Sequence, residues 1–266
     1  MPALLVLWDV DYTLLDAGGV GMQLYRIAFA EMFGGEPPVP GSMAGRTDRG
    51  IALEVLTLAG VPEPRREVAR FEAVMAAHAP ELAPLVRRRG RALPGAAEAL
   101  AAVAASGAGA GHNPGADGQP PRPVVQSLLT GNIRPLAEVK LAALGLTSHL
   151  DLDVGAYGDA HETRSELVGP ARQRAVAAYG ADFGGEATVL VGDTPLDMDA
   201  ALVTGARAVG VATGHFTMAE LAGAGAHAVL PDLADAGQVV TAIWGERALA
   251  RPGRPLLTRP AVPGDG

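Results

Sequence analysis

Two aspartates lie close together near the start of the chain, where residues 9–13 read Asp-Val-Asp-Tyr-Thr. The apolar residues 3–7 before them predict a short buried strand that ends at this point. Carboxylates at i and i+2 can face one site where an extended chain turns, with Asp9 as a nucleophile and Asp11 as a proton donor and acceptor. Acids after a strand also cap turns, so the pair alone leaves both interpretations open.

Two further apolar runs end in polar residues. Thr130-Gly131-Asn132 follows a predicted strand at 124–129, and a hydroxyl with accessible amide groups at a helix entry suits a phosphate oxygen. A Thr N-cap with a Gly turn explains the same residues structurally. Asp193 follows a predicted strand at 188–191, where a carboxylate is a hard oxygen ligand suited to Mg²⁺.

The residues after Asp193 have a structural explanation. Pro195 suits the first position of a helix, Thr194 suits the N-cap, and Asp197 would complete a capping box. Asp197 is therefore expected to support the site, whereas Asp193 stands before the helix and is the candidate ligand.

The elements that would position these residues alternate along the chain, which predicts an α/β layer structure with a mostly parallel sheet. Ligands bind such sheets at the carboxyl ends of the strands, where Asp9, Thr130 and Asp193 are expected. The predicted strands are residues 3–7, 124–129, 188–191, 206–211 and 227–230, and the predicted helices are residues 94–105, 134–144, 166–179, 195–204 and 218–223.

Residues 18–90 interrupt this alternation, because they contain only helical patterns, at 22–33, 49–59 and 67–77. We interpret them as a helical lobe inserted into a core made of residues 1–17 and 91–250. Residues 106–123 contain five Gly and four Pro, and they and the tail at 251–266 are expected to be disordered.

Composition excludes several classes of function. A net charge of −8 argues against a nucleic-acid partner, which calls for a basic face. The absence of cysteine excludes disulfides and thiolate chemistry and fits the cytoplasm. No stretch predicts a signal peptide or a membrane span, so we expect no membrane partner. We expect a monomer or homodimer that acts on a small molecule.

Taken together, these motifs resemble the haloacid dehalogenase superfamily. Its first motif, Asp-x-Asp-x-Thr/Val, is met by residues 9–13, its second by Thr130 and its fourth, Gly-Asp-x-x-x-Asp, by residues 192–197. The helical insertion is similar to the cap of the subgroup that includes phosphoglycolate phosphatase and β-phosphoglucomutase. The resemblance implies a doubly wound core with an inserted α-helical cap.

The resemblance also implies an activity, namely hydrolysis of a small phosphate monoester through a phosphorylated aspartate. Mg²⁺ would be held by the Asp9 side chain, the Asp11 backbone carbonyl and Asp193. Thr13, Gly131 and Asn132 join the candidates for binding the substrate. A phosphomutase would use the same two aspartates, and a non-catalytic, phosphate-responsive module is the alternative from another class. Asp11 argues against a dehalogenase, which lacks the second acid.

The third motif of the family is a Lys or Arg that binds phosphate and nucleophile. Lys140, the single lysine of the chain, lies close to Thr130 and is expected on a solvated face of the next helix. Arg164 is the preferred candidate, with Arg172 and Arg174 as alternatives.

Within the cap, residues 45–48 (Gly-Arg-Thr-Asp) are similar to a substrate loop of this subgroup. Arg46 could select an anionic leaving group, because a guanidinium matches carboxylate and phosphate geometry. A surface Arg46 followed by an N-cap at Asp48 is the structural alternative.

Overall fold

A computed structural model describes residues 3–107 and 123–245. The predicted insertion at 106–123 falls mostly outside these residues and the tail at 251–266 entirely so. Within the described part, a parallel sheet has the strand order β4-β1-β5-β6-β7, and a two-stranded antiparallel ribbon pairs β2 with β3. The α/β prediction is confirmed.

The strands of the main sheet agree with the predicted segments to within two residues. They are β1 (Leu4–Trp8), β4 (Val124–Leu128), β5 (Thr188–Gly192), β6 (Arg207–Val211) and β7 (Ala228–Leu230). The ribbon strands β2 (Leu15–Asp16) and β3 (Arg91–Ala92) were not predicted.

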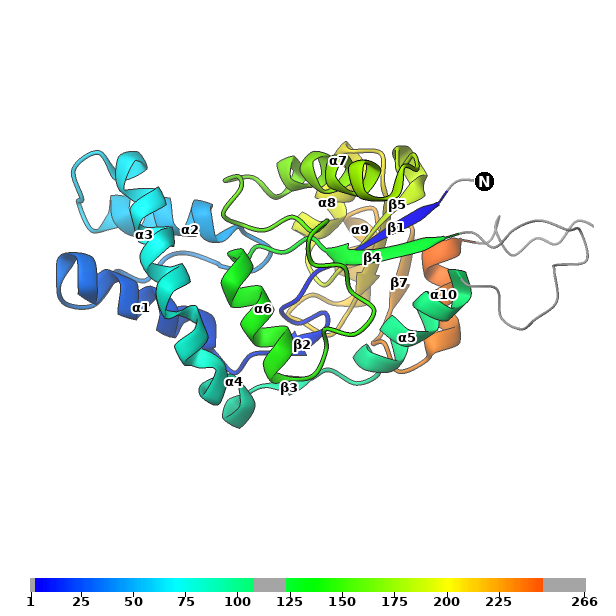
Figure 1. The fold of residues 1–266 in the computed structure, drawn as a ribbon, viewed down its shortest axis with the longest axis horizontal. Coiled ribbons are helices and arrows are strands. Elements are labelled where there is room, and N and C mark those ends of the chain that lie inside the picture. Colours follow the sequence, from blue (N-terminus) through cyan, green and yellow to red (C-terminus); the bar gives the residue numbers. More distant parts are fainter. Residues whose placement is uncertain (1–2, 108–122, 246–266) are drawn as a thin grey trace, which may run out of the picture.

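Helices cover both faces of the sheet (Figure 1). The core helices are α5 (Ala96–Gly107), α6 (Arg134–Ala143), α7 (Val168–Tyr179), α8 (Pro195–Val203), α9 (Met218–Gly223) and α10 (Ala236–Trp244), with short 3-10 turns η2 (Arg164–Leu167) and η3 (Gly185–Ala187). Alternating side chains of β1 separate two apolar cores: Val6 and Trp8 pack with α5, α6 and α10, whereas Leu5 and Leu7 pack with α7 and α8. A strand buried on both faces explains why residues 3–7 are continuously apolar.

Between β2 and β3 the chain forms a helical lobe, drawn at the left of Figure 1. It contains α1 (Val20–Phe33), α2 (Asp48–Leu58), α3 (Pro64–His78), η1 (Ala79–Leu82) and α4 (Ala83–Arg89). The β2–β3 ribbon pairs the segment that enters the lobe from the core with the segment that returns to the core. We call residues 18–90 the cap from here on, as a description of position.

Backbone contacts fix the start of α2 against the core. The amide of Asp48 donates to Gly131 O (2.6 Å) and that of Arg49 donates to Gly158 O (3.0 Å). The Asp48 carboxylate in turn accepts from the amide of Ile133 at the entry of α6 (2.8 Å). The N-cap of α2 is Thr47, whose hydroxyl accepts from Gly50 N, so the expected N-cap at Asp48 is wrong by one residue.

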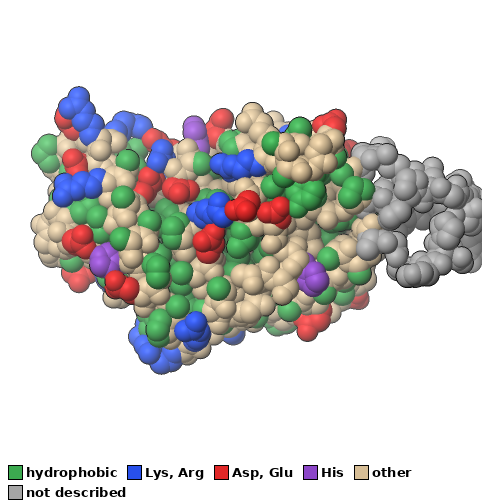
Figure 2. All heavy atoms as spheres, in the orientation of Figure 1, with side chains coloured by type: hydrophobic (Ala, Val, Ile, Leu, Met, Phe, Trp, Pro, Cys, Tyr) green, Lys and Arg blue, Asp and Glu red, His purple; other side chains and the backbone are tan. Residues whose placement is uncertain are grey.

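The surface carries charges of both signs. On the face shown in Figure 2, acidic and basic side chains are interspersed over cap and core. No helix within residues 3–107 and 123–245 is both long and apolar enough to cross a membrane.

Candidate active site

A cavity of about 360 Å³ lies where the carboxyl ends of β1, β4 and β5 meet the cap. Asp9, Thr130 and Asp193 line it from the three strand ends, and the start of α1 and the loop before α2 line it from the cap. The sheet therefore brings together residues that are up to 184 positions apart in the sequence.

Asp9 and Arg164 form a buried ion pair. Arg164 Nη2 lies 2.6 Å from Asp9 Oδ1 and donates also to the carbonyl of Leu129 (2.9 Å). Burial raises the pKa of Asp9 to about 6, although Arg164 opposes this rise. Arg164 remains a cation, because Asp197 and Asp9 outweigh the burial that would lower its pKa.

Asp197 supports this pair from α8. One of its oxygens lies 2.6 Å from Arg164 Nη2, and the other accepts from the amide and hydroxyl of Thr194. The predicted capping box is confirmed. Because the same carboxylate caps α8 and binds the guanidinium, the helix start fixes the direction in which Arg164 approaches Asp9.

Asp11 is held by Lys140, contrary to the sequence prediction. Lys140 is only 2% exposed and donates to both carboxylate oxygens of Asp11 (2.8 and 2.6 Å) and to Asn132 Oδ1 (2.6 Å). The expectation that Lys140 lies on a solvated face is therefore wrong. Its ammonium has three donors and all three have acceptors, which satisfies a cation buried in the core.

Thr130 and Asn132 complete this network. The Thr130 hydroxyl oxygen accepts from both the amide (3.2 Å) and the side chain (2.8 Å) of Asn132. Since its lone pairs are used in this way, the hydroxyl proton of Thr130 is directed to another acceptor. Asn132 also donates to Asp11 Oδ2 (2.7 Å), so it connects the ends of β1 and β4.

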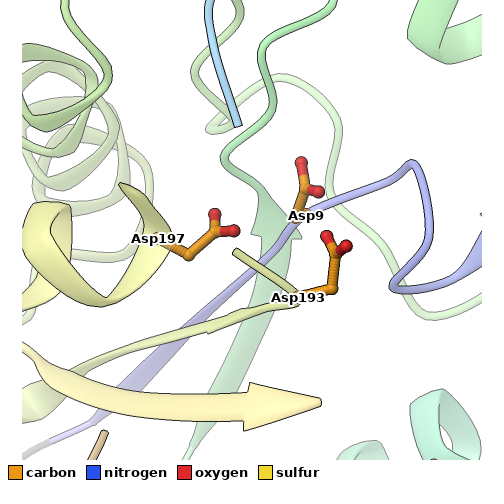
Figure 3. A group of neighbouring side chains, drawn as sticks. All are labelled: Asp9, Asp193 and Asp197. Carbon is orange, nitrogen blue, oxygen red and sulfur yellow. The ribbon is translucent and has the colours of Figure 1, made fainter. Parts of the chain in front are cut away.

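Asp193 completes a group of three acids with Asp9 and Asp197 (Figure 3). Their ligand atoms all lie within 4.8 Å of one another. Burial, with the negative charges of Asp9 and Asp197, raises the pKa of Asp193 to about 9, and Asp193 Oδ1 has no hydrogen-bond partner among the described residues. Clustered hard oxygens, one of them unsatisfied, fit a divalent cation such as Mg²⁺ between Asp9 and Asp193.

Other predicted residues differ in their placement. Gly131 lines the cavity, whereas Thr13 is fully buried and does not line it. Arg46 lines the cap side, but its guanidinium pairs with Glu54. The function of each remains a prediction.

The alternatives for the third motif lie elsewhere. Arg172 donates to Thr188 Oγ1 (2.9 Å) and the carbonyl of Thr204 (2.9 Å), and Arg174 donates to the carbonyl of Gly155 (2.5 Å). Neither lines the cavity, so Arg164 is the arginine that the fold brings to Asp9.

Lys140 could have been found from helical periodicity. It shares the buried face of α6 with Leu136, Ala137 and Leu141, at i−4, i−3 and i+1. A lysine on such a face needs a buried partner, and the carboxylates of the first motif were the available ones.

Comparison with known protein families points to the same part of the chain. A family model described as HAD-hydrolase-like matches residues 167–236, which include Asp193 and Asp197. No curated protein matches the sequence.

Solved structures share the fold at low sequence identity. A predicted phosphatase from Clostridium acetobutylicum is 13% identical with a TM-score of 0.60, covering 90% of this chain and 99% of the other. A hydrolase from Pseudomonas syringae is 21% identical with a TM-score of 0.56, covering 89% and 96%. A putative β-phosphoglucomutase from Bacteroides vulgatus is 14% identical with a TM-score of 0.56, covering 94% and 91%.

The family-model match falls on the part of the chain that carries the last two acids of the site. The core and its inserted helices have the arrangement of the hydrolases and phosphatases named above. Residues 167–236 thus match a HAD-hydrolase-like family model, and the described chain shares the fold of the hydrolase and the phosphatase named above.

Proposed function

We propose that this protein is a Mg²⁺-dependent phosphatase that hydrolyses a small phosphate monoester through a phosphorylated Asp9. The observation that carries the proposal is the pairing of the two first-motif aspartates with two different buried cations. Asp9 contacts Arg164 and Asp11 contacts Lys140, so one cavity holds two carboxylates with separate partners. This division suits a nucleophile and a proton carrier.

Arg164 supports attack by Asp9. A carboxylate and a phosphate repel each other, and a guanidinium that already touches Asp9 can also bind a phosphate oxygen. Arg164 Nε has no partner among the described residues, so this N–H of the guanidinium is available to donate to a phosphate oxygen. The Thr130 hydroxyl would donate to a second phosphate oxygen.

Asp9, Asp193 and the backbone carbonyl of Asp11 would hold the metal ion. When bound, Mg²⁺ supplies positive charge that offsets the repulsion between the carboxylate and the phosphate. The unpartnered Asp193 Oδ1 supports this assignment.

In the first step, an Asp9 oxygen forms a bond to phosphorus while the bond to the leaving oxygen breaks. Asp11 must enter this step protonated, in place of one of its two contacts with Lys140; it gives that proton to the leaving oxygen, and an alcohol departs. In the second step, Asp11 takes a proton from water as the water oxygen attacks phosphorus, which releases inorganic phosphate and restores Asp9. Lys140 and Asn132 fix the direction in which Asp11 faces during both steps.

Release of inorganic phosphate from phenyl phosphate tests the proposal. The wild type should release phosphate with Mg²⁺ and lose this activity with a chelator. Asp9→Asn should abolish turnover, because an amide does not attack phosphorus, and Asp11→Asn should slow it by roughly 10²–10⁴-fold. Near-normal activity of Asp9→Asn would contradict the proposal.

A further inference from the structure

The cap side of the cavity is mainly apolar. Val20, Met22, Met43 and Ile51 line it together with glycines of the α1 entry. In a phosphatase of the proposed kind, the phosphate faces Asp9 and the leaving group faces this wall. A volume of about 360 Å³ for the whole cavity restricts that group to a small one.

The lysine and arginines that line the described cavity are Arg46, Lys140 and Arg164, and each already contacts a carboxylate; the one histidine on the described lining, His215, packs against Tyr12 on the core side. Arg164 and Lys140 bind the two aspartates of the reaction centre. Arg46 pairs with Glu54 and also donates to the carbonyls of Ser42 (3.2 Å) and Gly50 (3.4 Å). The charge of Arg46, which could otherwise bind a second anionic group of the substrate, is thus neutralised by Glu54 within the cap.

The remaining charges on this side are negative. Asp48 is 6% exposed, and its carboxylate is held by two neutral donors, Ile133 N (2.8 Å) and Tyr25 Oη (2.9 Å). Asp16, also on the lining, pairs with Arg91 (2.8 Å). A carboxylate brought to this wall would lose hydration without gaining an unpaired cation.

Resting on the proposed function, we infer that the site prefers the monophosphate ester of a small uncharged alcohol, whose apolar part packs on Val20, Met22, Met43 and Ile51. This differs from the sequence-based expectation that Arg46 selects an anionic leaving group. The pairing of Arg46 with Glu54 is the reason for the difference.

Two isosteric esters test the inference. 4-Carbamoylphenyl phosphate and 4-carboxyphenyl phosphate have nearly the same shape and differ in the charge of the leaving group. The wild type should show a kcat/KM at least about tenfold higher for the carbamoyl ester. Equal values, or a preference for the carboxylate, would overturn the inference and leave the proposed function intact. If neither these esters nor phenyl phosphate is hydrolysed, the proposed function fails and the inference fails with it.

A variant cycle separates charge from leaving-group chemistry. Glu54 does not line the cavity, so Glu54→Gln should leave kcat/KM for the carbamoyl ester unchanged and raise that for the carboxylate ester by about tenfold. Adding Arg46→Gln should cancel this gain. An unchanged ratio of the two esters in Glu54→Gln would show that the pairing of Arg46 does not set the preference, and would overturn the charge argument.

Discussion

At the scale of single residues, the buried ammonium of Lys140 binds Asp11 and Asn132. Lys140→Met keeps the apolar stem of the side chain and removes these bonds. We expect kcat for phenyl phosphate to fall by roughly 10–100-fold, the usual effect of a residue that orients a reacting group. Arg172→Met, which alters a partly buried cation far from the cavity, is the matched control. Equal kcat values for wild type and Lys140→Met would show that Asp11 needs no such support.

Arg164 and Arg172 offer a second comparison, since both lie on the segment formed by η2 and α7. Arg164→Ala should lower kcat/KM by roughly 10²-fold or more, because it removes the charge-assisted contact at Asp9. It should also weaken inhibition by inorganic phosphate. Arg172→Ala should affect stability instead, through its bonds to Thr188 and Thr204. Equal effects of the two variants on phosphate inhibition would contradict the assignment.

The pairing of these side chains shows what the sequence could predict at this scale. Because ligands bind parallel sheets at the carboxyl ends of the strands, the sequence was enough to place Asp9, Thr130 and Asp193 at one cavity. It did not reveal Lys140, because a residue's burial on α6 depends on which face of the helix meets the core. The sequence also did not reveal the salt bridge of Arg46, since Arg46 lies in the loop before α2 and Glu54 lies within that helix.

At the scale of elements, the entry of α2 carries a buried acid that titrates. Burial raises the pKa of Asp48 from 3.8 to about 6, an effect that Ile133 N, Lys140 and Tyr25 reduce and that Asp11 increases. The folded protein therefore keeps a proton that the unfolded chain releases, so stability from Asp48 is greatest below pH 3.8 and is lost as pH rises through about 6.

Urea unfolding of wild type and Asp48→Asn at pH 4 and pH 7 measures this effect. The variant has no titrating group at this position and can keep both hydrogen bonds. Between the two pH values, the wild type should lose roughly 2–3 kcal/mol of unfolding free energy relative to Asp48→Asn. Parallel pH profiles for the two proteins would mean that Asp48 titrates normally.

The elements themselves were predicted unevenly. Strands buried on both faces and helices with strong caps agreed closely with the sequence pattern, as for α9. The ribbon strands β2 and β3 contain two residues each, too few for any periodicity to show. The helices α4 and α10 were also missed. In α4, three consecutive arginines conceal the apolar face.

At the scale of the whole molecule, cap and core approach so closely that only glycine fits. A Cβ on Gly131 would meet Arg46 O of the cap at 1.9 Å, and one on Gly158 would meet Gly131 O at 1.7 Å within the core and Asp48 N of the cap at 2.9 Å. These are backbone atoms, so they cannot move aside as a flexible side chain would. These contacts join the loop after β4 to the loop that begins α2.

Gly158→Ala should therefore displace the loop at Gly131, which contacts the start of α2. We expect a loss of about 1–3 kcal/mol in stability, as for other overpacked sites, together with a lower kcat. Gly169→Ala on α7 is the control, because no atom lies within 4 Å of the added methyl group, and it should be neutral or slightly stabilising. Thermal unfolding and phosphate release measure the two effects, and similar results for both variants would show that the close approach is not required.

Arg164 also has one hydrogen bond outside the core, from Nη1 to the carbonyl of Gly45 in the cap (3.3 Å). The guanidinium that pairs with Asp9 is thus shared between the two lobes, so its place in the site depends on the position of the cap. If Arg164 binds phosphate as proposed, linkage requires that the Gly45 contact and phosphate binding affect each other to the same degree. A substitution at Gly45, whose Cβ would meet Thr194 Oγ1 at 2.4 Å, would then disturb phosphate binding through Arg164 without changing the charge of any group in the cavity.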